Sequence, residues 1–154
     1  MLALIIVALD QWTKVLAESH LLYGVPREVF SWFNLALAYN EGAAFSFMAN
    51  MGGAQRWILF GVSALASVAL IIWMLRINGS DRMYLLPLGS ILGGAIGNGI
   101  DRYQTGRVVD FIQWHYGGYY FPTFNIADVA ITCGAVVLLI MSFWFDDSKE
   151  EASA

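Results

Sequence analysis

Long apolar runs separated by short polar stretches dominate this sequence. Three of the runs contain no charged residue: Trp57 to Leu75, Met83 to Ile100 and Val129 to Phe145. Each has 17 to 19 residues, and a helix needs about 17 to 25 residues, at about 1.5 Å each, to cross a hydrocarbon core of about 30 Å. The pattern therefore predicts three membrane-spanning helices.

A fourth apolar segment begins at the N-terminus, but it contains charges. Met1 to Leu9 is apolar, whereas Asp10 and Lys14 interrupt the continuation to Leu22. A signal peptide would have a basic first region and an uninterrupted apolar one, so we interpret residues 2–22 as a helix that carries polar residues. Only nine residues precede Asp10, which leaves open whether this helix starts short or the native chain extends further.

These segments predict a mainly α membrane protein with one integral membrane domain over residues 1–154. The connection over residues 23–56 is the longest, and its stretch from Glu28 to Tyr39 is rich in the aromatic and aliphatic residues that favour short strands. We expect a small β-sheet at the membrane surface and a short interfacial helix from Ala43 to Met51. The four transmembrane helices are placed at about 2–22, 57–75, 83–102 and 126–145, with the last connection at 103–123.

Composition supports a bilayer and excludes several function classes. The chain is 58% hydrophobic and 13% charged, against about 25% charged residues in an average soluble domain. Its net charge is -4 and it has no basic patch, which excludes nucleic-acid binding. Lysine and arginine are almost evenly divided between the two sides of the predicted spans, so the positive-inside rule leaves the orientation open.

Metal, nucleotide and thiol chemistry have little support in the sequence. The two histidines, His20 and His115, stand apart, and no Cys/His spacing is typical of zinc. No G-x-G-x-x-G follows a predicted strand, and the P-loop lysine is missing. The single cysteine, Cys133, has apolar neighbours, which favours an inert core residue. We therefore expect neither a metal nor a cofactor.

Polar residues inside the predicted spans need an explanation, because charge at membrane depth is costly. Asp10 and Lys14 are four positions apart, so on a helix they share a face and can form a structural ion pair. In the third span, glycines recur every four residues, which permits close helix contact; we favour packing within a monomer, although self-association remains open. These glycines are Gly89, Gly93 and Gly97.

The end of the third span carries three polar residues within one helical turn, and the glycines do not explain them. They are Asn98, Asp101 and Arg102. Asp101 and Arg102 are adjacent and point in different directions on a helix, so we expect each to reach a different partner. We expect this cluster to fix the neighbouring loops and the segment that carries Asp110.

Two further carboxylates, Asp110 and Asp128, lie eighteen positions apart at the edges of apolar segments. If both reach one pocket, repulsion and desolvation make the pair hold one proton near neutral pH, which is the arrangement used by aspartic proteases. Other interpretations stay open: two acids bonded to loop amides, a relay in a proton-coupled transporter, or an assembly protein. The spacing permits proximity without proving it.

The chain resembles the bacterial prolipoprotein signal peptidases, also called signal peptidase II, over nearly its whole length. Five ordered blocks carry the resemblance: Asp10-Gln11-Trp12-Thr13-Lys14, Asn40-Glu41-Gly42-Ala43-Ala44-Phe45, Gly94-Ala95-Ile96-Gly97-Asn98-Gly99-Ile100-Asp101-Arg102, Val109-Asp110-Phe111 and Phe124-Asn125-Ile126-Ala127-Asp128.

This resemblance implies an intramembrane aspartyl endopeptidase in which Asp110 and Asp128 form the catalytic dyad. Asp10 and Lys14 then match a buried supporting pair. The positions that match pocket-shaping or ligand-binding residues of the family are Asn40, Gly42, Asn98, Asp101, Arg102 and Asn125.

The family also implies partners and a location. Its substrate is a prolipoprotein whose cysteine carries diacylglycerol, and cleavage falls just before that cysteine. It implies contact with membrane lipids, inhibition by the lipopeptide globomycin, and a multi-pass position in the bacterial inner membrane. Both termini would be cytoplasmic, the two longer connections would lie outside, and Asp110 and Asp128 would lie near the outer ends of spans three and four, with residues 28–51 flanking the substrate.

Overall fold

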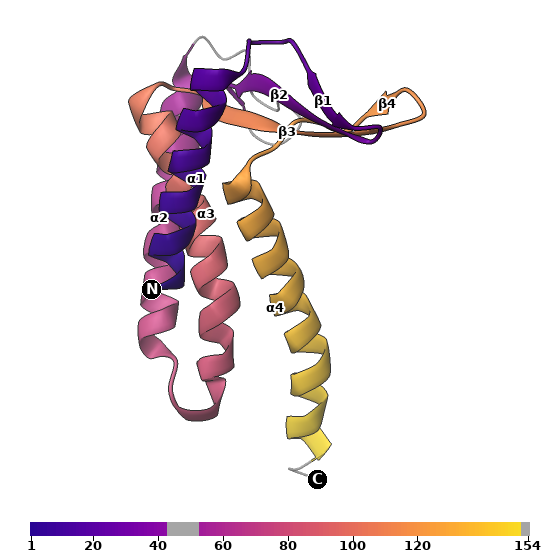
Figure 1. Ribbon diagram of the computed structural model, residues 1–154. Helices are drawn as coiled ribbons and strands as arrows, with labels where there is room; N and C mark the ends of the chain where they lie inside the picture. The colour runs from indigo at the N-terminus through magenta and orange to yellow at the C-terminus, as the bar shows by residue number, and fades with distance from the viewer. Residues whose placement is uncertain (43–52, 152–154) are drawn as a thin grey trace.

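Four long helices and a small sheet make up the computed structural model of the chain, which describes residues 1–42 and 53–151 (Figure 1). The predicted interfacial helix from Ala43 to Met51 falls outside these described residues. A short 3-10 helix, η2 (Gly79–Tyr84), links the second and third long helices. The long helices are α1 (Leu2–His20), α2 (Ala54–Arg76), α3 (Leu85–Gln104) and α4 (Ile126–Glu151).

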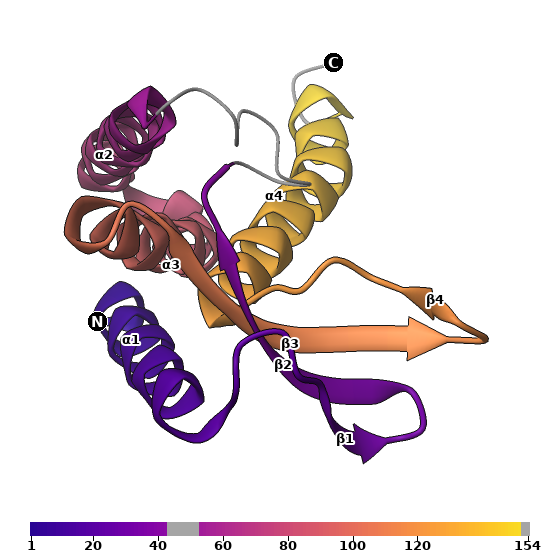
Figure 2. The same ribbon diagram turned by 90° about the horizontal axis from the view of Figure 1, so that it is seen from above.

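The sheet lies across one end of the helices and extends beyond them (Figures 1 and 2). Its four antiparallel strands follow chain order: β1 (Arg27–Phe30), β2 (Phe33–Asn40), β3 (Val108–Tyr116) and β4 (Tyr119–Tyr120). An apolar core joins the sheet to the last turn of α1, where Ala17 packs with Leu37, Val109 and Phe111. This core fixes the central strands against the helices.

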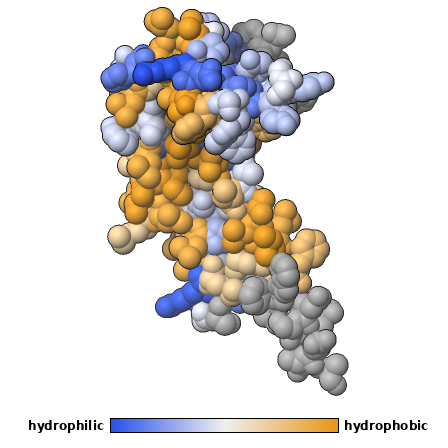
Figure 3. All heavy atoms as spheres, turned by 45° about the vertical axis from the view of Figure 1, so that its right-hand side comes forward, coloured by the Kyte–Doolittle hydropathy of each residue, from blue (hydrophilic) through white to orange (hydrophobic). Residues whose placement is uncertain are grey.

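Three helices of the described chain are long and apolar enough to cross a membrane. These segments are Ala54–Arg76, Asp81–Gln104 and Ile126–Phe143. The remaining long helix, α1, is not among them, because Asp10, Lys14 and Glu18 make it less apolar. On the face that Figure 3 presents, the surface over the helices is mostly apolar, and hydrophilic and apolar residues lie together at the end that carries the sheet. The predicted mainly helical membrane fold with a small sheet is confirmed, whereas a fourth span is not established.

Helix α3 is the centre of the bundle, and its glycines bring the neighbouring helices close. In the most apolar 18-residue stretch of Asp81–Gln104, 56% of the residues are buried inside the protein. In the corresponding stretch of α2 the share is 0%. A methyl group at Gly93 would lie 2.8 Å from Ile6 Cβ of α1, and one at Gly94 would overlap the Ala127 carbonyl of α4. The glycines of α3 therefore allow close contact between helices of the same chain. Gly134 of α4 adds to this contact, because it lies against the Pro87 carbonyl of α3.

The connection predicted at residues 103–123 forms two strands that the sequence analysis missed. Helix α3 ends where Gly106 adopts a φ of +83° and its N–H, like that of Thr105, donates to the Asp101 carbonyl. The chain then enters β3, where Asp110 lies on a strand and pairs with Ala38 of β2; its position near the outer end of the third span stays a prediction. The run of Val, Phe, Ile and Trp in this segment is the sequence feature that could have predicted the strand.

Packing around the glycines predicts that Gly134→Ala lowers the melting temperature of the purified protein in detergent. The added methyl would lie 2.7 Å from the Pro87 carbonyl oxygen, and overpacking of this kind costs about 1–3 kcal/mol. Gly61→Ala in α2 is the matched control, because nothing lies within 4 Å of the new methyl and alanine favours a helix by up to about 1 kcal/mol. Equal effects of the two substitutions would contradict this packing.

Candidate active site

Backbone pairing brings the segment before α4 against the strand that carries Asp110. The N–H groups of Phe111 and Ile112 donate to the Phe124 carbonyl at 3.1 and 2.9 Å, and the Phe124 N–H donates to Ile112 at 3.0 Å. Helix α4 begins two residues later, at Ile126. This short bridge places Asp110 and the first turn of α4 on the same side of the bundle.

Asn125 and Asp128 form a reciprocal cap at the start of α4. The Asp128 N–H donates to Asn125 Oδ1 at 2.9 Å, and the Asn125 N–H donates to Asp128 Oδ2 at 3.3 Å. A carboxylate at this position also faces the positive end of the helix dipole. The sequence of this turn therefore fixes the Asp128 side chain at the start of α4.

Two asparagine amides connect the aspartates. Asn125 Nδ2 donates to Asp110 Oδ1 at 2.7 Å and to Asn98 Oδ1 at 3.2 Å. Asn98 Nδ2, on α3, donates to Asp128 Oδ1 at 2.8 Å. Asn98 and Asn125 are both buried, so the two carboxylates belong to one hydrogen-bonded cluster built from α3, β3 and the first turn of α4.

Asp110 is 3% exposed, and it lies on β3, outside the candidate membrane spans. Burial raises the pKa of its carboxyl from an ordinary 3.8 to about 7, and the nearby charge of Asp128 adds to this rise. The hydrogen bond from Asn125 opposes it. Near neutral pH, Asp110 is therefore able to hold a proton.

Behind this pair lies the buried ion cluster of α1 and α3. Lys14 Nζ is 2.8 Å from Asp10 Oδ2, which confirms the predicted pair, and also 2.8 Å from Asp101 Oδ2. Asp101 Oδ2 in addition accepts the Val109 N–H at 3.2 Å, directly before Asp110. The cluster at the end of the third span therefore does hold the Asp110 segment, as the sequence predicted.

Arg102 extends toward the loop that follows β2. Its Nη2 donates to the Gly42 carbonyl at 3.2 Å and its Nη1 to the Asn98 carbonyl at 3.3 Å. Asn40 Oδ1 in turn accepts the Gly42 N–H at 3.0 Å. Within the described residues, the buried Nε of Arg102 has no hydrogen-bond partner, so a donor is available beside the carboxylates.

A cavity of about 740 Å³ opens over both aspartates. Asp110, Asp128 and Arg102 form its polar part. Its wall is otherwise mostly apolar, with aromatic rings from β3 and from the segment that precedes α4: Trp114, Phe121 and Phe124. The arrangement can bind a largely apolar ligand and present two carboxylates to it.

The structure corrects the sequence interpretation of one residue, Cys133, and adds a second residue, Gln11, that the interpretation left out. Cys133 is exposed and lines this cavity, so the prediction of a core residue is wrong; its apolar neighbours on α4 form a surface that suits lipid as well as protein. Gln11 was overlooked, although its Nε2 donates to Asp101 Oδ1 at 2.8 Å. Its place between the charges Asp10 and Lys14 was the only available signal.

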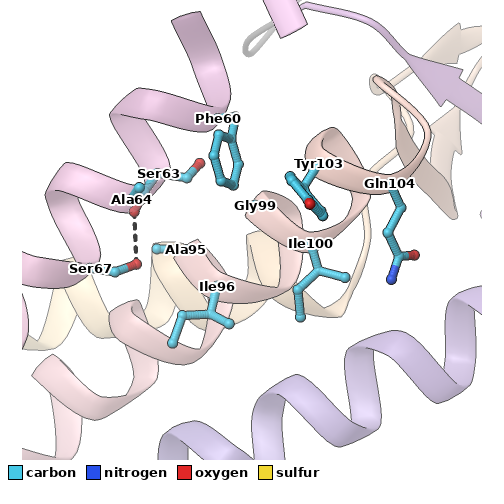
Figure 4. Close-up of a pocket in the computed structure, with 10 residues that line it drawn as sticks. All are labelled: Phe60, Ser63, Ala64, Ser67, Ala95, Ile96, Gly99, Ile100, Tyr103 and Gln104. Carbon is cyan, nitrogen blue, oxygen red and sulfur yellow. Dashed lines mark hydrogen bonds between the residues drawn. The ribbon is translucent and has the colours of Figure 1, made fainter. Parts of the chain in front are cut away.

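A second hollow, of about 400 Å³, lies between α2 and α3 and shares no lining residue with the first (Figure 4). Phe60, Ser63 and Ser67 face it from α2, and Gly99 and Tyr103 face it from α3. It has no carboxylate, histidine or cysteine in its wall. Among residues 1–42 and 53–151, moreover, no group of His, Cys, Asp or Glu has the arrangement of a metal site.

Comparison with known proteins supplies the family. The family model described as signal peptidase (SPase) II matches residues 2–144. The chain belongs to the signal peptidase II family. It is therefore an aspartic-type peptidase, and all five sequence blocks that carried the resemblance lie inside the matched range.

Relatives of similar length agree with this membership. The lipoprotein signal peptidase of Hydrogenovibrio crunogenus is 41% identical over 150 residues, which cover 97% of this chain and 87% of the relative. That of Acinetobacter baumannii is 44% identical over 154 residues, covering 99% and 86%. A bacterial membrane enzyme solved by the in meso method at 2.3 Å resolution superposes with a TM-score of 0.82 at 32% identity, over 96% of this chain and 88% of that one.

The environment of Asp110 predicts that Asp110→Asn stabilises this signal peptidase II at high pH. The pKa of the carboxyl is higher in the folded protein, at about 7, than its ordinary 3.8. Its contribution to stability is therefore complete below about pH 4 and is lost as the pH rises through about 7. Asparagine avoids this penalty and keeps an oxygen to accept from Asn125, so the gain at pH 8 should be on the order of 2 kcal/mol.

Thermal unfolding in detergent at pH 4.5 and pH 8 measures this difference. Glu28→Gln is the control, since Glu28 is exposed on β1 and its replacement should change the melting temperature little at either pH. A stabilisation by Asp110→Asn that is the same at both pH values would contradict the raised pKa.

Proposed function

We propose that this member of the signal peptidase II family removes the signal peptide from diacylglyceryl-modified prolipoproteins, and that Asp110 and Asp128 are its catalytic residues. The observation that supports the site most strongly is that both carboxylates line one cavity and share the amides of Asn98 and Asn125. The names of the relatives, lipoprotein signal peptidases, support the substrate class.

The surroundings of the two aspartates favour different roles. Asp128 is half-buried and accepts hydrogen bonds from Asn98 and from the Asn125 backbone at the start of α4, so we assign it the role of general base. Asp110 is more deeply buried, with its pKa raised to about 7, so it carries the proton. Hydrogen bonds to a carboxylate and a helix N-terminus stabilise the charged form, whereas burial disfavours it.

These roles give a sequence of proton transfers for peptide hydrolysis. The Asp128 carboxylate takes a proton from a water molecule, whose oxygen attacks the scissile carbonyl carbon. Asp110 donates its hydrogen bond to the carbonyl oxygen, where negative charge develops. As the tetrahedral intermediate collapses, the C–N bond breaks and the proton now on Asp128 passes to the departing amine.

The rest of the cavity suits the remaining parts of such a substrate. Arg102 and Asn40 line the polar edge of the cavity, and the Gly42 N–H donates to Asn40 beside it. Trp114, Phe121 and the outward face of α4 offer apolar surface to acyl chains. We propose that a globomycin-type lipopeptide competes for the same volume.

The fold also supports a proposal for the membrane arrangement. The sheet lies at one end of the helices, and the start of α1 and the end of α4 point to the other (Figure 1). We place the chain in the bacterial inner membrane as a monomer with α1 as a fourth span, both termini cytoplasmic and the sheet outside. There the site meets a lipid-bearing signal helix near the outer surface.

Substitution of either aspartate tests the catalytic assignment. Asp110→Asn and Asp128→Asn should each lower the rate of cleavage of a purified diacylglyceryl prolipoprotein by about 10³-fold or more, while the protein stays folded by thermal unfolding. Glu28→Gln, on the exposed strand β1, should cleave at the normal rate. Turnover retained by either aspartate variant excludes the dyad, and proton-linked flux in liposomes without any peptide product would indicate a transporter.

Lipidation of the substrate should matter as much as its sequence. The same precursor without diacylglycerol should be cleaved poorly, because each CH₂ of an acyl chain contributes about 0.8 kcal/mol when buried. Side-by-side assays of the two precursors measure the effect, with a scrambled lipobox as the control for sequence recognition. Equal kcat/KM values with and without lipid refute the assignment of the apolar wall to acyl chains.

A further inference from the structure

Lys14 has a role that its pairing with Asp10 does not explain. Its side chain is 3% exposed, and an ammonium group has three donors. All three have partners: Asp10 Oδ2 at 2.8 Å, Asp101 Oδ2 at 2.8 Å and Asn98 Oδ1 at 3.0 Å. One contact is enough to neutralise the charge of Asp10, so the contacts of Lys14 with Asp101 and Asn98 need another explanation.

The two carboxylates around Lys14 each hold the backbone beside a different catalytic aspartate. Asp10 Oδ1 accepts the Ala127 N–H at 2.9 Å, directly before Asp128. Asp101 Oδ2 accepts the Val109 N–H at 3.2 Å, directly before Asp110. Since Lys14 binds both carboxylates, a single ammonium group connects the backbone of α4 with that of β3.

The third contact sets the direction of an amide. An ammonium group can only donate, so the oxygen of Asn98 faces Lys14 and its Nδ2 faces Asp128, at 2.8 Å. The reverse orientation would place the amide NH2 against the Lys14 ammonium, donor against donor, and the amide oxygen against the Asp128 carboxylate oxygen. Without Lys14, Asn98 Oδ1 keeps only the 3.2 Å contact from Asn125 Nδ2, which also serves Asp110.

We propose that Lys14 is a positioning residue of the peptidase reaction: it sets the separation of the two aspartates through Asp10 and Asp101, and it orients the Asn98 amide that donates to Asp128. The inference rests on the proposed function of the dyad. Asp110 from β3 and Arg102 from α3 interact electrostatically with Asp128, and Lys14, Asp10 and Asp101 form the adjoining charged cluster.

Lys14→Met is the direct test, because it keeps most of the length of the side chain and removes the donors. A displaced dyad should lower kcat about 100-fold and leave KM within about threefold, since Lys14 does not line the substrate cavity. Loss of the oriented amide also removes the fixed donor to Asp128, so the acidic limb of the pH–rate profile should move. A merely structural lysine would lower the melting temperature without moving this limb.

Two further variants keep the test decisive. Asn98→Ala leaves Lys14 with both carboxylates and removes the donor to Asp128, so it should move the acidic limb in the same direction even if Lys14→Met fails to fold. Gly134→Ala, which strains the packing of α4 far from Lys14, is the control for lost stability and should keep the normal profile.

Each outcome has one meaning. A shift in both Lys14→Met and Asn98→Ala, absent from Gly134→Ala, supports the proposal. A normal profile in Asn98→Ala, or an equal shift in Gly134→Ala, overturns it. The proposed function fails separately, if Asp110→Asn or Asp128→Asn retains turnover, so the two failures are distinguishable.

Discussion

The structure depends on keeping charge stable inside an apolar bundle. Lys14 and its carboxylate partners Asp10 and Asp101 are almost completely buried. Removing such groups from water costs several kcal/mol each unless every donor and acceptor is used. Here Asp10 Oδ1 accepts the Ala127 N–H, and Asp101 Oδ2, which also contacts Lys14, accepts the Val109 N–H. The cluster that satisfies the charges therefore also fixes the chain on both sides of the cavity.

Close helix packing makes this cluster possible. Gly97 lies against Asp10, where any added methyl would stand 2.5 Å from the carboxylate oxygen. Gly93 and Gly94 give similar contacts with α1 and α4. Because α3 approaches both helices so closely, short side chains are able to bridge all three, and the asparagines reach both aspartates. Packing and site geometry are thus two results of the same small residues.

The dyad is asymmetric because its members belong to different kinds of element. Asp128 lies in the first turn of a helix, where the Asn125 N–H and the Asn98 amide donate to it. Asp110 lies on the buried part of β3 and accepts a hydrogen bond from Asn125. In the proposed reaction one carboxylate accepts a proton and the other donates one, and this difference in surroundings suits those two roles.

Much of this was readable in the sequence, because hydrophobic period and motif order are local properties. The apolar runs located the three long spans, the ion pair followed from the spacing of Asp10 and Lys14, and five ordered blocks identified the family. Tertiary structure alone decided that Asp110 stands on a strand, that Cys133 faces the cavity, and that Lys14 joins both sides of the site. Each of these depends on contacts between segments distant in the chain, and a pattern of neighbours along one segment does not contain them.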